Sequence, residues 1–209
     1  MKVSRSTIID LPPEVVWSEV QTARILIHIA WPLMRFVPVG DEPLENFKSG
    51  GRYLVKLRLF GMLPFGKQWI VTSVHDPKTG EWPKQLRDNG SSAIIKKWDH
   101  WITISPNAEG GTRYSDDVEV SAGIMTPVIW ALAWVFYWHR QKRWRGLAQT
   151  LRARQLIAEE MAVFEHAKDS GNSADSWRAL ERAHIVSQLY LGPHLASHWA
   201  MLRFAVNER

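Results

Sequence analysis

The feature that most constrains this fold is a long apolar helix that follows a block of alternating segments. Thr126 and Pro127 predict its start, because threonine caps a first turn and proline fits the first helical position. Residues 129–138 are almost wholly apolar, and the helix is predicted to run to about Ala167. The apolar stretch at residues 122–138 lies at the short end for crossing a membrane. We therefore expect a helix buried against a curved sheet.

The residues before this helix alternate with period two, which predicts antiparallel strands that each bury one face. The predicted strands cover residues 3–9, 53–59, 68–74, 82–88, 93–104 and 113–120. Turns are predicted at Lys78-Thr79-Gly80 and at Asn89-Gly90, a dipeptide that favours hairpins. Short helices are predicted over residues 15–20, 22–30, 175–190 and 193–206, with Gly192 ending the third.

The composition suits an ordinary globular chain of 209 residues, 45% hydrophobic and 22% charged. Because cysteine is absent, disulfides, thiolate metal ligands and thiol nucleophiles are excluded. The first ten residues have no apolar signal core, so we expect a cytoplasmic protein.

Several short sequence segments resemble those of the START-like (SRPBCC) superfamily, which includes polyketide cyclase-like and lipid-carrying members. They are Lys2-Val3-Ser4-Arg5-Ser6, Pro12-Pro13-Glu14-Val15-Val16-Trp17, Gly50-Gly51-Arg52-Tyr53, Trp98-Asp99-His100-Trp101 and Gly111-Thr112-Arg113-Tyr114-Ser115-Asp116. The resemblance implies an α+β helix-grip fold over residues 1–150, in which a curved antiparallel sheet surrounds the long helix and leaves a ligand cavity. Members bind diverse ligands, and many are not enzymes.

The last part, residues 151–209, is predicted to be a separate helical segment that carries a hairpin. It resembles a small bacterial family of uncharacterised function. The words that carry this resemblance are Leu180-Glu181-Arg182-Ala183-His184 with Gln188, then His194 and His198-Trp199-Ala200-Met201-Leu202.

A first candidate site lies in the expected cavity. If the last hairpin turns near Ala108, His100 pairs with Asp116, Trp98 with Val118 and Ile102 with Tyr114, all on the inner face. A histidine–aspartate pair there has three interpretations: acid–base catalysis, orientation of a ligand's polar end, or a buried structural pair.

The leading hypothesis is therefore a binding protein for a hydrophobic small molecule, a lipid or an aromatic compound. The expected cavity lining is Trp17, Tyr53, Leu57, Trp69, Trp98, His100, Tyr114, Asp116, Trp130 and Trp134. One alternative is a cyclase- or dehydratase-like enzyme that uses His100 and Asp116. Whether the chain is an enzyme at all stays open at this stage.

A second candidate site lies in the C-terminal hairpin and gives the other alternative, a metal-binding protein. Glu181 and His184 share one helix face, and His194 and His198 share a face of the next helix. If these four residues converge, their imidazole and carboxylate groups suit zinc or another divalent metal. Helix pairing through hydrogen-bonded histidines is the competing interpretation.

Residues 139–154 contain six arginines and lysines and no carboxylate. Such a run is typical either of a solvated helix face or of a site for anionic lipid at a membrane surface. One tryptophan within the run is weak support for nucleic acid, which we do not expect as a partner. The C-terminal hairpin is also compatible with a homodimer contact.

Overall fold

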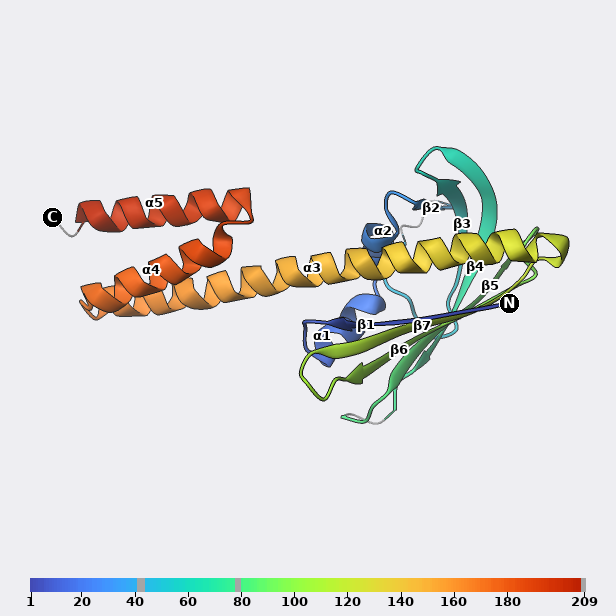
Figure 1. The fold of residues 1–209 in the computed structure, drawn as a ribbon, viewed down its shortest axis with the longest axis horizontal. Helices are drawn as coiled ribbons and strands as arrows, with labels where there is room; N and C mark the ends of the chain where they lie inside the picture. The colour runs from blue at the N-terminus through green and yellow to red at the C-terminus, as the bar shows by residue number, and fades with distance from the viewer. Residues whose placement is uncertain (41–43, 78–79, 208–209) are drawn as a thin grey trace. The chain divides into compact units, whose positions relative to one another are not determined.

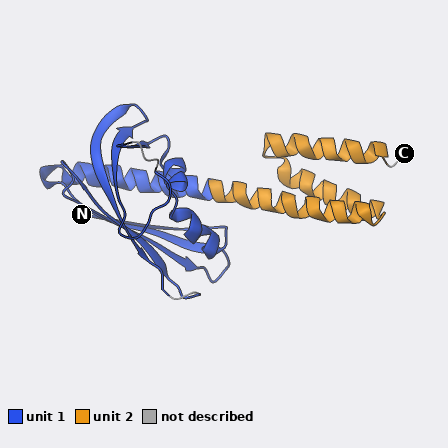
Figure 2. Ribbon diagram, turned by 180° about the vertical axis from the view of Figure 1, so that it is seen from behind, with its two compact units in different colours: residues 1–146 blue, residues 147–209 orange. Residues whose placement is uncertain are grey.

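The computed structural model describes residues 1–40, 44–77 and 80–207. The predicted turn at Lys78-Thr79-Gly80 therefore falls mostly outside the described residues. The chain divides into two compact units, Met1–Gly146 and Leu147–Arg209 (Figure 2).

Unit 1 is built on an antiparallel sheet of seven strands in the order β1-β7-β6-β5-β4-β3-β2. The strands are β1 (Lys2–Ile9), β2 (Met34–Pro38), β3 (Arg52–Leu59), β4 (Leu63–His75), β5 (Lys84–Ser92), β6 (Lys97–Pro106) and β7 (Thr112–Ser121). Among the described strands, only the pairing of β1 with β7 joins strands that are distant in sequence. The strand β2 was not predicted from the sequence.

Two short helices, α1 (Pro13–Val20) and α2 (Ala23–Ala30), separate β1 from β2. The short 3-10 helix η1 (Gly123–Met125) leads into α3 (Thr126–Asp169), whose first half belongs to unit 1. Figure 1 shows the sheet curving around this half of α3. The α+β helix-grip class is thereby confirmed.

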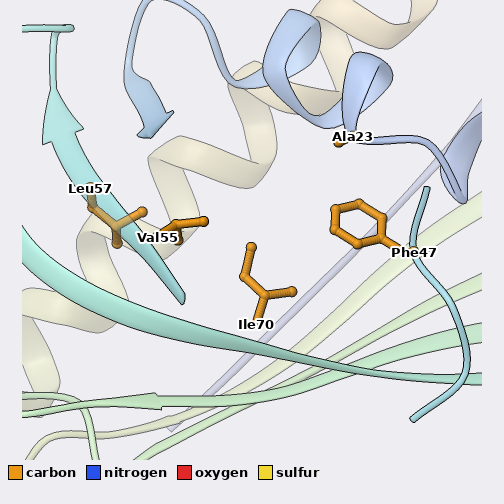
Figure 3. Close-up of a cluster of buried hydrophobic side chains, with 5 residues drawn as sticks. All are labelled: Ala23, Phe47, Val55, Leu57 and Ile70. Atoms are coloured by element: carbon orange, nitrogen blue, oxygen red, sulfur yellow. The ribbon is translucent and has the colours of Figure 1, made fainter. Parts of the chain in front are cut away.

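Alternating burial explains why the sheet grips the helix. In β7, Tyr114, Asp116, Val118 and Val120 are buried while the residues between them are more exposed. The α3 residues Ile129, Ala133 and Tyr137 recur every fourth position and pack against this face. A second buried cluster joins β3, β4, α2 and the loop before β3, and its members are Ala23, Phe47, Val55, Leu57 and Ile70 (Figure 3).

The predicted turn at Asn89-Gly90 is wrong, because both residues lie inside β5. Gly90 serves close packing between strands rather than a turn. A Cβ atom at this position would lie 2.1 Å from the backbone oxygen of Trp69 on β4. The chain instead turns after Ser92, whose hydroxyl accepts a hydrogen bond from the Ile95 amide at 2.9 Å.

Unit 2 contains the second half of α3 together with α4 (Ser173–Ser187) and α5 (Leu191–Asn207). The side chain of Asn172 caps α4 by accepting a hydrogen bond from the Asp175 amide at 3.1 Å. The helices pack through a cluster made of Phe164, Ala179, Leu180 and Phe204.

The turn of the helical hairpin comes earlier than predicted. It falls at residues 188–190, and Gly192 lies in the first turn of α5. Within the described residues, no helix combines the length and the apolar character that a membrane crossing requires.

Candidate functional site

A cavity of about 190 Å³ lies in unit 1, between the inner face of the sheet and α3. Apolar side chains from α2, α3 and strands β2 to β6 form most of its wall. The exceptions are the polar side chains of Gln68, Thr72, Asp88, His100 and Arg140. A mainly apolar wall with a few polar groups is the usual composition of a small-molecule site.

Asp116 anchors a buried hydrogen-bond network behind this wall. Its Oδ1 atom lies 2.9 Å from His100 Nε2 and accepts a hydrogen bond from the Tyr114 hydroxyl at 3.0 Å. Its Oδ2 atom accepts one from Gln141 Nε2 at 3.1 Å. Arg140 donates from Nη2 to the Tyr114 hydroxyl at 2.9 Å, and its Nη1 atom lies 3.8 Å from Asp116 Oδ1. All five residues are buried.

The electrostatics of this network fix the protonation of its members. Burial by itself raises the pKa of Asp116, but Arg140, His100 and Gln141 together outweigh it and hold that pKa below its ordinary value. Burial also lowers the pKa of His100 below its ordinary value, by more than the bond to Asp116 raises it. Asp116 is therefore an ionised acceptor, and neutral His100 donates its Nε2 proton to it. The other ring nitrogen of His100 is left as an acceptor.

Asp88 is a functional candidate that was not predicted from the sequence. It lies in the cavity wall and pairs with His100 across β5 and β6. Its Oδ1 atom accepts a hydrogen bond from the Val71 amide at 2.9 Å. Burial raises its pKa to about 7, because this effect exceeds the lowering by the Val71 amide and Arg140. The alternation of Leu86, Asp88 and Gly90 could have placed it on the inner face, but the predicted turn put it at a strand end.

The cavity reaches the surface near α3. Phe60, Leu132 and Val135 all line it, and all three side chains are exposed to solvent. Phe60 also has a positive φ of 51° in the turn between β3 and β4, a conformation that bulky residues rarely adopt. These three apolar residues therefore form the mouth of the cavity.

The predicted register of β6 and β7 was wrong by two residues. His100 pairs with Val118 and Ile102 with Asp116, whereas Trp98 pairs with Val120. The predicted face was nevertheless right, because a shift of two residues leaves each side chain on the same side of the sheet. His100 and Asp116 consequently meet along a diagonal of the two strands.

The structure brings only part of the predicted lining together. Leu57, Trp98 and His100 line the cavity. Tyr114 and Asp116 lie behind the wall, in the network described above. The lining does not include Trp17, Tyr53, Trp69, Trp130 or Trp134.

These five rings have other contacts. Trp17 Nε1 donates to Asp76 at 3.0 Å, and Trp130 Nε1 donates to the Lys2 carbonyl at 2.7 Å. The Tyr53 hydroxyl donates to the Asn46 carbonyl at 3.2 Å. Exposed Trp69 and Trp134 each lie beside a guanidinium group, that of Arg52 and that of Arg5 respectively. None of these five side chains is among those that line the cavity.

The basic run at residues 139–154 is not a uniformly solvated helix face. Arg140 is buried in the cavity wall. Arg143 donates to the backbone carbonyl of His28 at 3.2 Å. Lys142 and Arg145 are exposed.

In unit 2 the structure gathers three of the four predicted metal ligands. One ligand atom each from His184, His194 and His198 lies within 4.8 Å of the others. Glu181 is exposed and does not belong to this group. It lies one helical turn before His184, farther from the hairpin turn that brings α5 to the histidine.

Two family models match the chain. The first, described as a domain of unknown function (DUF8410), matches residues 7–149. The second, described as a protein of unknown function (DUF3703), matches residues 151–209. No curated protein matches the chain significantly.

Solved structures share the fold of unit 1 at low sequence identity. The hypothetical protein jhp0584 from Helicobacter pylori is 11% identical, with a TM-score of 0.55 over 71% of this chain and 88% of that chain. TTHA0849 from Thermus thermophilus is 14% identical, with a TM-score of 0.51 over 72% and 99%. CV1439 from Chromobacterium violaceum is 16% identical, with a TM-score of 0.50 over 70% and 96%. These likenesses bear on the fold alone.

Proposed function

The chain belongs to the DUF8410 family over residues 7–149, the part that contains the cavity, and we propose that this domain binds a small hydrophobic molecule in that cavity. The observation that carries the proposal is the cavity itself, about 190 Å³ in volume and lined mainly by apolar side chains. Burial of apolar ligand surface would supply the affinity, and the polar wall residues would orient the ligand.

The volume limits the size of the ligand. An apolar cavity of about 150 Å³ holds benzene, so this cavity suits a compact molecule of about one or two rings, or a short acyl chain. A longer tail would have to leave through the mouth at Phe60, Leu132 and Val135, whose exposed apolar side chains could cover it.

The charges in the wall favour a ligand with a neutral polar end. Arg140 and Asp116 carry opposite charges in one buried network, and His100 is neutral. Asp88 is protonated in part of the molecules near its pKa of about 7. The wall therefore has no surplus positive charge to compensate a buried carboxylate or phosphate, which costs several kcal/mol when unpaired. A hydroxyl or carbonyl group fits better.

The test uses a matched pair of variants on α3. Val135→Trp adds bulk at the mouth of the cavity, and Val128→Trp makes the same change at an exposed position that does not line it. Calorimetric titration with one- and two-ring phenols and ketones should show binding to the wild type and to Val128→Trp, and at least about tenfold weaker binding to Val135→Trp. Equal binding to all three proteins, or tighter binding of the matching carboxylates, would contradict the proposal.

A second candidate function, a cyclase- or dehydratase-like enzyme, is favoured by the Asp116–His100 bond. The buried carboxylate holds His100 in one orientation, with its second nitrogen free to accept a proton. In a dehydration, His100 would take a proton from a substrate carbon, and Asp88, when protonated, would give one to the departing hydroxyl, so that water leaves.

The two functions differ in the fate of the ligand. An enzyme converts a bound hydroxy-ketone to the product 18 mass units lighter, about the mass of one water, and His100→Gln abolishes this conversion while the protein stays folded. A binding protein returns the ligand unchanged, and His100→Gln changes only its affinity. Mass spectrometry of the ligand after incubation separates these outcomes.

A further inference from the structure

Three histidine side chains meet at the hairpin of unit 2, and none of them belongs to the lining of the cavity in unit 1. His184 comes from the last turn of α4, and His194 and His198 come from the first turns of α5. Their ring centroids are 4.5–4.7 Å apart in all three pairings. The antiparallel hairpin explains this meeting, because it places the end of one helix beside the beginning of the next.

A network of buried hydroxyl groups fixes the orientation of His184. The Ser197 Oγ atom lies 3.1 Å from His184 Nδ1 and donates to the His194 carbonyl at 2.8 Å. Ser187 donates in the same way to the His184 carbonyl at 2.8 Å. Each hydroxyl has one proton, so Ser197 accepts the Nδ1 proton of His184. The lone pair of His184 is then on Nε2, as in histidines that bind metal through this atom.

The other two histidines also offer ligand atoms. His194 Nδ1 is buried and has no hydrogen-bond partner among the described residues. His198 is exposed on the solvent side of the group. Neutral imidazoles are the form that binds metal ions.

We propose that His184, His194 and His198 bind one divalent transition-metal ion, with zinc as the best fit, and leave a coordination position open toward solvent. Their ligand atoms lie within 4.8 Å of one another. In tetrahedral zinc sites with Zn–N bonds of about 2.0–2.1 Å, the nitrogens are about 3.3 Å apart. Small side-chain rotations that shorten each nitrogen–nitrogen distance by at most about 1.5 Å would therefore complete the site.

The donor set decides the class of metal. Three imidazole nitrogens without a carboxylate suit zinc, nickel, cobalt or copper, whereas calcium and magnesium prefer oxygen ligands. Structural zinc sites have four protein ligands, whereas catalytic zinc sites have three and leave the fourth position open. Three histidines with an open fourth position match the catalytic pattern. The site would therefore accept an exogenous ligand such as water or an anion at the metal.

The experiment titrates the untagged chain of 209 residues with Co²⁺ and Zn²⁺ after treatment with a chelator. The expected result is one ion per chain, with the visible absorption of four-coordinate Co²⁺ and its loss when Zn²⁺ displaces it. The double variant His194→Ala with His198→Ala should lose this absorption. His166→Ala, an exposed histidine of α3 in the same unit, should retain it. Absence of the Co²⁺ spectrum in the wild type, or its persistence in the double variant, would overturn the proposal.

Two further variants separate metal binding from folding. His198→Gln changes only the exposed member of the group, so the hairpin should keep its helical circular dichroism while the affinity for Zn²⁺ falls. Ser197→Ala removes the group that orients His184 and should weaken Zn²⁺ binding by about 10–100-fold. If both variants fold and bind Zn²⁺ as tightly as the wild type, the three histidines serve helix pairing only, and the metal site is refuted.

Discussion

Replacing Asp88 by asparagine should make the stability of unit 1 less dependent on pH. Asp88 has an ordinary pKa of 3.8 that burial raises to about 7. The folded protein therefore holds this proton more tightly than the unfolded chain does. The contribution of Asp88 to stability is greatest below pH 3.8, and it decreases as the pH rises through 7, because folding must then either bind a proton or bury a charge.

The size of this effect follows from the two pKa values. Each pKa unit corresponds to 1.36 kcal/mol, so raising the pKa from 3.8 to about 7 costs about 4 kcal/mol at pH values well above 7. Between pH 5 and pH 8 the wild type should lose about 3 kcal/mol through this group alone. Asparagine has no charge to bury, and its carbonyl oxygen can still accept the hydrogen bond from the Val71 amide.

Urea unfolding followed by tryptophan fluorescence provides the assay. Ten of the twelve tryptophans lie in residues 1–146, so the signal reports mainly unit 1. The difference in unfolding free energy between Asp88→Asn and the wild type should grow in favour of the variant from pH 5 to pH 8. Asp117→Asn, on the exposed face of β7, is the matched control and should show no such trend. A difference that is constant with pH would refute the assignment of a raised pKa to Asp88.

Three other substitutions test single contacts, two of them within unit 1 and one within unit 2. Gly90→Ala should destabilise unit 1 by about 1–3 kcal/mol, because the new methyl group meets the Trp69 carbonyl; an unchanged urea midpoint would contradict this. Arg140→Met leaves Asp116 as an uncompensated buried charge and should lower the free energy of unfolding by about 3–5 kcal/mol at pH 7. The decrease should be smaller at pH 4, where Asp116 can take a proton. Equal decreases at both pH values would argue against an ionised Asp116. Asn172→Ala removes the cap of α4 and should lower the stability of unit 2 by about 1 kcal/mol, measured by hydrogen exchange of the α4 amides.

The sequence predicted those parts of the fold that depend on local periodicity. Alternation in β6 and β7 placed His100 and Asp116 on the inner face, although the register was wrong by two residues. The spacing of histidines on two helices likewise predicted their approach, since helix geometry and a short connection leave few alternatives. In both cases the periodicity within one strand or one helix was enough to show which side chains share a face.

The rest depends on contacts between distant segments. Arg140 was assigned to a basic run, but its side chain reaches Tyr114 and Asp116 across the core. The lining predicted from the sequence included five tryptophans, yet Trp69 and Trp134 lie beside arginines at the surface instead. Gly90 was predicted to be a turn residue. A glycine is required there because the β4 backbone approaches closely, and the sequence of β5 does not reveal that contact. Composition and local pattern cannot distinguish these cases.

Native mass spectrometry of protein purified without a metal-affinity tag tests the central claim most directly. If the cavity holds a small hydrophobic molecule, the spectrum should show an organic adduct on the chain that is released on unfolding. This adduct should be uncharged, and apolar apart from a hydroxyl or carbonyl group. The Val135→Trp variant should carry less of it than Val128→Trp. A chain that retains no organic molecule and binds none of the phenols or ketones would contradict the account.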